Sequence, residues 1–264
     1  MDRRARADAL VRATLSLGDA TLRAAYVASL ARAWRVELLA RSLDAVCERA
    51  EQAEAGARET LVAIVDALNG EGMGEVVQRL REQAAGESLL ALERLIRCPA
   101  DGASDARVKT PERIPDYGRG RPLTLGERKS LARRPDRDTM QRLLLDPHPD
   151  VILRLLRSPR VVEDDVVRLA AKRPGRGEVL AEIARSTRWA HRPRVRMALV
   201  MNPATPVEIA ARIAGLLLRP ELEQVAGSPG VAAGVRALCL EHLERRPPVE
   251  PHDHDVGQGD GRVH

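Results

Sequence analysis

The chain has 264 residues, which suffices for one or two domains with an ample core. Aromatic residues make up 2% of it and Phe is absent, so any core must be built from Leu, Val, Ile and Ala. Its 43 basic and 38 acidic residues give a net charge of +5, a near balance that produces little long-range field.

Neither a membrane span nor a secretion signal is expected. No stretch approaches the roughly 18 consecutive apolar residues that a transmembrane helix needs. Residues 1–17 are charged throughout and lack the apolar centre of a signal peptide. Three widely separated cysteines suit a reducing compartment, so we expect a cytoplasmic protein.

Residues 1–98 are predicted to form a separate helical region. Asp19 is placed to cap a first helix, and more helices are expected at 60–68, 76–80 and 89–96. Whether this region caps the following segment or forms a small bundle stays open. The buried stripe is expected to comprise Leu22, Ala25, Tyr26, Leu30, Trp34, Leu38, Leu39, Leu43, Val46 and Cys47.

Residues 99–122 are predicted to be a linker, because prolines and glycines recur there without apolar periodicity. The linker ends on Arg119-Gly120-Arg121-Pro122, which matches the core of an AT-hook. In that motif an extended backbone lays two arginines in the minor groove of DNA. The alternative is a solvated linker that enters the next segment.

From residue 123 to residue 243 the chain repeats a phrase of a proline, a polar turn and two apolar pairs. Pro135 and Pro147 are followed by pairs at the same offsets, so each unit hides one stripe of a short helix. We therefore expect an all-α fold with a stacked short-helix array, an α-solenoid. The residues expected to be buried are Leu143, Leu144, Val151, Ile152, Leu155, Leu156, Val167, Ile183 and Ile213.

One unit boundary carries a complete helix-start signal. Thr205 suits the N-cap, Pro206 the first helical position, and Glu208 completes a capping box. The sequence therefore predicts a helix that begins directly after Thr205.

These units resemble the leucine-rich-repeat variant and HEAT-like family of bacterial helical repeats, over roughly residues 123–243. The resemblance implies repeats of about 24 residues, which two twelve-residue units would match, stacked in a right-handed superhelix. Some members of the family hold an iron–sulfur cluster, but Cys47, Cys98 and Cys239 share no ligand spacing. We expect no cofactor.

A cluster of arginines around a tryptophan is the strongest candidate binding patch. Such a composition is typical of protein-binding hot spots and also suits phosphate contacts. The alternative is that the tryptophan fills a gap between repeats while the arginines are solvated. The patch consists of Arg185, Arg188, Trp189, His191, Arg192, Arg194 and Arg196.

No catalytic or metal site is predicted. The glycines at positions 70, 72 and 74 mimic a phosphate loop, but no strand precedes them and no Lys-Ser/Thr follows. Residues 244–264 are expected to be a disordered tail, so its histidines do not indicate a metal site.

These features favour a non-catalytic scaffold that binds an unknown protein partner through its repeat surface. The alternative is a helical-repeat protein that grips nucleic-acid phosphates through the arginine patch or through Arg119 and Arg121. An enzyme on a helical frame is a third hypothesis, because fold alone does not determine function.

Overall fold

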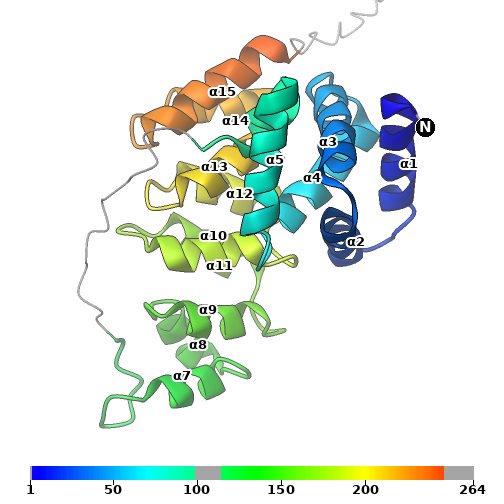
Figure 1. Cartoon of the computed structure of the whole chain (residues 1–264). Helices are drawn as coiled ribbons and strands as arrows, with labels where there is room; N and C mark the ends of the chain where they lie inside the picture. The colour runs from blue at the N-terminus through cyan, green and yellow to red at the C-terminus, as the bar shows by residue number, and fades with distance from the viewer. Residues whose placement is uncertain (1, 99–113, 247–264) are drawn as a thin grey trace, which may run out of the picture.

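A computed structural model describes residues 2–98 and 114–246 of the protein (Figure 1). Within these two ranges the chain forms fifteen α-helices and no β-strand, so the prediction of an all-α fold is confirmed. None of the described helices combines the length and the apolar character needed to cross a membrane.

The N-terminal region contains six helices gathered around α3. Helix α3 packs against α1, α4, α5 and α6, and Leu39, Leu43, Val46, Ile64 and Leu80 are buried in the shared core. The helices are α1 (Arg3–Leu15), α2 (Ala20–Ala33), α3 (Val36–Glu51), α4 (Ala55–Leu68), α5 (Gly74–Glu87) and α6 (Leu90–Ile96).

Helix α2 begins where the sequence predicts but buries a different face. The Asp19 carboxylate accepts hydrogen bonds from the backbone N–H groups of Thr21 and Leu22, as an N-cap should. Leu22 itself is 56% exposed, so the predicted stripe was wrong there. The buried side chains are Ala24, Val27 and Ala31, whose small size lets α2 pack closely against α4.

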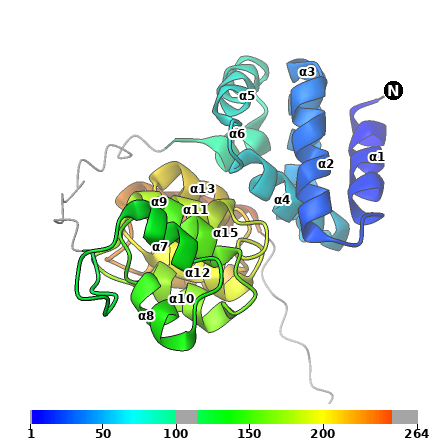
Figure 2. The same cartoon turned by 90° about the horizontal axis from the view of Figure 1, so that it is seen from below.

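Nine helices follow in the second region and stack in sequence order (Figure 1). Helix α9 contacts α7 and α11, whereas α12 contacts α10 and α14, so alternate helices are neighbours. Figure 2 views this stack along its length, with the N-terminal helices to one side. The helices are α7 (Leu125–Leu131), α8 (Arg137–Leu143), α9 (Pro149–Leu156), α10 (Glu163–Ala171), α11 (Gly177–Arg185), α12 (Pro193–Met201), α13 (Val207–Ala214), α14 (Arg219–Ala226) and α15 (Ala233–Arg245).

The predicted core of the second region is buried at eight of its nine positions. Val167 is the exception and is only partly buried. In α10 the inward stripe is Val166, Leu169 and Ala170, and Val167 lies about 100° further round the helix.

Thr205 is not an N-cap, so this prediction was wrong. Helix α13 begins at Val207, with Pro206 at the N-cap position and no side-chain capping bond. The Thr205 side chain is buried, and its hydroxyl donates a hydrogen bond of 2.6 Å to the carbonyl oxygen of Leu199. That carbonyl belongs to the last turn of α12, where carbonyls lack helical donors. Thr205 therefore completes the end of one helix rather than the start of the next.

The two regions are joined through the C-terminal end of the stack. Helix α6 packs on α13, and Leu216 belongs to the apolar core of the N-terminal region. Arg97 forms an ion pair of 2.9 Å with Glu241 on α15. The N-terminal helices therefore cover one flank of helices α13–α15.

The predicted linker and tail are described only in part. Residues 114–122 contain no helix, and α15 continues to Arg245, two residues beyond the expected end of the array. The remaining residues of both segments, 99–113 and 247–264, lie outside the described ranges, and so do His252, Asp253, His254 and His264.

Candidate functional site

Trp189, the centre of the predicted arginine patch, is buried with 3% of its surface exposed. Its indole Nε1 donates a hydrogen bond of 2.9 Å to the carbonyl oxygen of Leu156 at the end of α9. The guanidinium of Arg188 lies over the ring, 4.5 Å from its centroid, and donates to the carbonyl oxygens of Ser158 and Val161. The tryptophan thus ties the segment before α12 to the turn after α9 and presents no open face.

Three further arginines of the patch pair with carboxylates of the chain. Arg194 contacts Asp164 at 2.7 Å, Arg192 lies 3.8 Å from Glu163, and Arg185 contacts Glu182 at 2.7 Å. These arginines remain 43–63% exposed, so their pairs are surface pairs that water and salt screen.

The last two members of the patch lie in different surroundings. The Nδ1 atom of His191 is 2.9 Å from the carbonyl oxygen of Thr187. Burial lowers the pKa of Arg196, which lies within electrostatic range of Asp66 of α4. The structure therefore does not gather the seven residues on one open face, and their role in binding stays a prediction.

Arg119 and Arg121 lie in a bent segment. Gly118 and Gly120 both have a φ of 69°, so the backbone around Arg119 turns rather than extends. Arg121 pairs with Glu127 of α7, the same carboxylate that completes the capping box of Thr124. A contact of these arginines with the minor groove would require both the turn and the pair to open.

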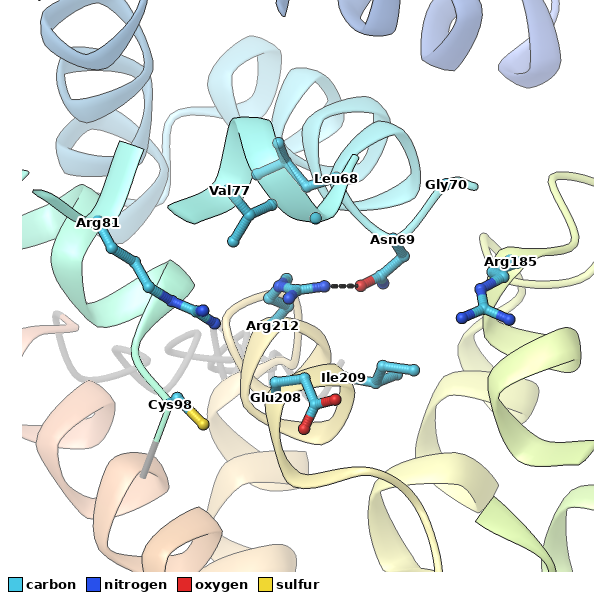
Figure 3. Close-up of a pocket in the computed structure, with 11 residues that line it drawn as sticks. Leu68, Asn69, Gly70, Val77, Arg81, Cys98, Arg185, Glu208, Ile209 and Arg212 are labelled. Carbon is cyan, nitrogen blue, oxygen red and sulfur yellow. Dashed lines mark hydrogen bonds between the residues drawn. The ribbon is translucent and has the colours of Figure 1, made fainter. Parts of the chain in front are cut away.

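A cleft of about 420 Å³ lies at the junction of the two regions (Figure 3). Helices α4 and α5 supply one wall, and α11 and α13 supply the other. Apolar and basic side chains share the lining. It is lined by Leu68, Asn69, Gly70, Gly74, Val77, Arg81, Cys98, Arg185, Glu208, Ile209 and Arg212.

Arg212 of α13 is the most buried charge in this cleft, with 7% of its surface exposed. Its Nη1 donates a hydrogen bond of 2.5 Å to the Asn69 side-chain oxygen (Figure 3). Its buried Nε has no acceptor among the described residues. Burial, reinforced by the nearby Arg81, lowers the pKa of Arg212 to about 10, so the guanidinium stays charged at neutral pH.

Two more arginines flank Arg212, as Figure 3 shows. Arg81 of α5 donates from Nε to the carbonyl oxygen of Ile96 at 2.7 Å, which fixes its guanidinium beside the cleft. Arg185 reaches in from the last residue of α11. Glu208, one turn before Arg212 on α13, is the one carboxylate of the described lining. The cleft therefore carries an excess of positive charge.

The glycine-rich turn between α4 and α5 borders the same cleft. Gly70 and Gly74 line it, and Gly72 has a φ of 74° that favours glycine. Gly74 is the first residue of α5, whose N-cap Met73 makes no side-chain capping bond. These glycines have neither the preceding strand nor the following Lys-Ser/Thr of a phosphate loop, yet they precede and open a 14-residue helix beside the cleft arginines.

Only Arg185 and the glycines mark this cleft in the sequence. Asn69 and Arg212 are separated by 143 positions in the chain. Arg81 and Arg212 look like ordinary polar positions of amphipathic helices, and only the packing of α6 on α13 brings them together. A single sequence does not reveal a contact of that separation.

Cysteine and metal chemistry add little to this site. Cys98 is exposed at the cleft, whereas Cys47 and Cys239 are buried. Burial raises the pKa of both buried thiols, to about 12 for Cys239. Across residues 2–98 and 114–246, no group of three or more His, Cys, Asp or Glu side chains is placed to hold a metal ion.

Comparison of the chain with protein-family models, with characterised proteins and with solved structures finds no match.

Proposed function

We propose that the protein is an interaction scaffold of the α-solenoid class, which holds a segment of a partner protein in the cleft between its two helical regions. The observation that carries this proposal is the cleft itself, where Leu68, Val77 and Ile209 lie beside three guanidinium groups. Apolar anchors with a few fixed polar groups are the usual composition of binding sites. The repeat phrase, the alternating helix contacts and the resemblance to leucine-rich-repeat variant proteins support the solenoid class.

Nucleic acid is the second candidate, and the geometry favours it less. Duplex binding needs a run of free cationic groups along an open surface. Arg188 lies over the Trp189 ring and donates to carbonyl oxygens, while Arg192 and Arg194 face carboxylates of α10. The near balance of charge over the whole chain adds little general attraction to phosphates.

We also propose that binding occurs without catalysis. The described lining offers one carboxylate, Glu208, and one thiol, Cys98, without a histidine beside them. Nucleophilic catalysis by a thiol needs a base within hydrogen-bonding reach. A single carboxylate likewise does not form an acid–base pair.

Cys98 provides the test, because it is the exposed thiol of the chain and lies at the cleft. A benzophenone maleimide attached there should photo-crosslink a partner that occupies the cleft. The matched control is Cys98→Ser combined with Ser130→Cys, which moves the label to an exposed position on α7 at the far end of the stack (Figure 1).

We expect a discrete protein adduct from the label at position 98 that the label at position 130 does not give. Excess unlabelled protein should compete the adduct away. Identical adducts from both positions would count against the cleft. Tight binding of duplex DNA at about 0.15 M salt, where surface charges are screened within ~8 Å, would favour the nucleic-acid candidate.

A further inference from the structure

We propose that the cleft recognises a phosphoryl group. We assign that group to a phosphorylated side chain of the partner protein, and this assignment rests on the proposed function. The cleft is lined by Arg81, Arg185 and Arg212 and by one carboxylate, Glu208. Arg185 already pairs with Glu182 at 2.7 Å, whereas Arg81 and Arg212 form no ion pair with a described carboxylate, so the cleft keeps an excess of positive charge. A phosphate monoester carries about −1.5 to −2 charges at pH 7 and would supply the negative charge that Arg81 and Arg212 lack.

Arg212 supplies the strongest indication of a missing anionic partner. Its side chain is more than nine-tenths buried, and Figure 3 shows it at the centre of the cleft. Asn69 satisfies one of its donors with a neutral oxygen, and no described carboxylate forms an ion pair with it. Because a buried charge is costly unless it is paired, an anion at this point would offset that cost.

The start of α5 supplies a second, independent feature. The first N–H groups of a helix have no partner within the helix and carry a partial positive charge. At α5 no side chain caps them, and Gly74 at the first position leaves the backbone accessible from the cleft. No other atom lies within 4 Å of a Cβ placed at Gly74, so the approach is open. Phosphate groups commonly bind at such helix ends.

The arrangement suits a phosphoryl group better than a single carboxylate. Guanidinium groups from three helices, α5, α11 and α13, line the cleft, whereas a carboxylate offers two oxygens in one plane. A phosphoryl group offers three oxygens in a tetrahedral arrangement. Clusters of arginines are also the usual way in which proteins recognise phosphorylated side chains.

The test measures binding of inorganic phosphate to the full chain by titration calorimetry, at constant ionic strength set with KCl. Acetate serves as the carboxylate probe. The second readout is the rate at which a disulfide reagent modifies Cys98, because a group bound in the cleft should shield that thiol. We expect phosphate to bind with a dissociation constant of about 1 mM or tighter and to slow the modification several-fold, while acetate does neither.

Arg81→Gln and Arg79→Gln form a matched pair for this measurement. Both remove one charge from α5, but Arg81 lines the cleft and Arg79 is exposed outside it. We expect Arg81→Gln to weaken phosphate binding about tenfold or more, because one charge-assisted contact is lost. Arg79→Gln should leave it unchanged. Arg185→Gln, at a partly exposed position, provides a second cleft variant that should fold normally.

Equal weakening by Arg79→Gln and Arg81→Gln would show a general charge effect and overturn the site. Equal binding of acetate and phosphate would overturn the phosphoryl assignment. To identify the carrier, a capped tripeptide with a central phosphoserine is compared with ribose 5-phosphate. Tighter binding of the peptide supports the partner protein, and tighter binding of the sugar phosphate overturns it.

These outcomes are separable from those of the proposed function. Phosphate binding is measured without any partner, so it can succeed where photo-crosslinking from Cys98 yields no adduct. Conversely, if a partner is crosslinked but phosphate neither binds nor slows the modification of Cys98, the scaffold proposal stands and the phosphoryl proposal is overturned.

Discussion

The two helical regions bury their apolar side chains in different ways. Helices α1–α5 have 13–16 residues and collect around α3, so residues far apart in sequence share one core. Helices α7–α14 have 7–9 residues, and each contacts mainly the helices next to it or one further along. A bundle with one shared core is expected to unfold as a unit, whereas the stability of a stack is a sum over the interfaces between neighbouring helices.

The largest expected effect tests this difference directly. Ile64→Ala in the N-terminal core and Leu155→Ala in the stack both remove fully buried side chains. Each should reduce the free energy of unfolding by about 2–5 kcal/mol, because a cavity remains. Hydrogen exchange should reveal loss of protection across α1–α6 for Ile64→Ala, but only in α7–α11 for Leu155→Ala. If both variants lost protection over equally many helices, the proposed difference between the N-terminal region and the stack would be wrong.

The next effect concerns the junction, where Asp66 of α4 is buried within electrostatic range of Arg196 of α12. Asp66 is 5% exposed, and one of its oxygens has no partner among the described residues. Burial raises the pKa of Asp66 from 3.8 to about 7, although Arg196 opposes the shift. The folded protein therefore holds a proton between about pH 4 and pH 7 that the unfolded chain releases.

Since Asp66 binds this proton only in the native state, its contribution to stability should fall as the pH rises through that window. Buried His242, whose pKa is lowered to about 3, contributes the opposite pH dependence below about pH 6.5, so the contribution of Asp66 is read from the difference between the original chain and its variant. The total loss is about 4 kcal/mol for three pKa units, and it should be absent below pH 4. Asp66→Asn should flatten this slope and stabilise the protein at pH 8 relative to the original chain. Urea unfolding at several pH values measures both. An unchanged slope in Asp66→Asn would mean that other groups cause the pH dependence.

The contrast between the regions also explains why the sequence predicted buried positions better in the stack than in α2. In the stack, proline turns and apolar pairs specify each short helix locally, so eight of the nine predicted core positions are buried. In the N-terminal region α2 buries Ala24 and Ala31 rather than Leu22, because close packing on α4 outweighs hydrophobicity. A stripe chosen by hydrophobicity alone cannot reveal that preference.

The candidate site was less accessible to prediction than the fold. The arginine patch was recognised by composition, but Trp189 is buried by packing on the end of α9. The cleft depends on contacts between helices that are more than 100 residues apart, such as Arg212 with Asn69. Such a site is specified by tertiary structure, and no local spacing encodes it.

The smallest effect concerns Thr205, where the sequence and the structure assign different hydrogen bonds. If the hydroxyl donates to Leu199, Thr205→Ala should lower the free energy of unfolding by about 1 kcal/mol, and Thr205→Ser should retain most of the stability. An N-cap would lose a similar amount with Ala, so the discriminating variant is Thr205→Asn. Asn is as good an N-cap as Ser, but it is larger than Thr in a site with 3% exposure. We therefore expect Thr205→Asn to destabilise the protein at least as much as Thr205→Ala, with amide protection lost at the end of α12. Full stability of Thr205→Asn in urea unfolding would restore the N-cap assignment. Thr205 would then stabilise the start of α13, the helix that follows it, rather than the end of α12.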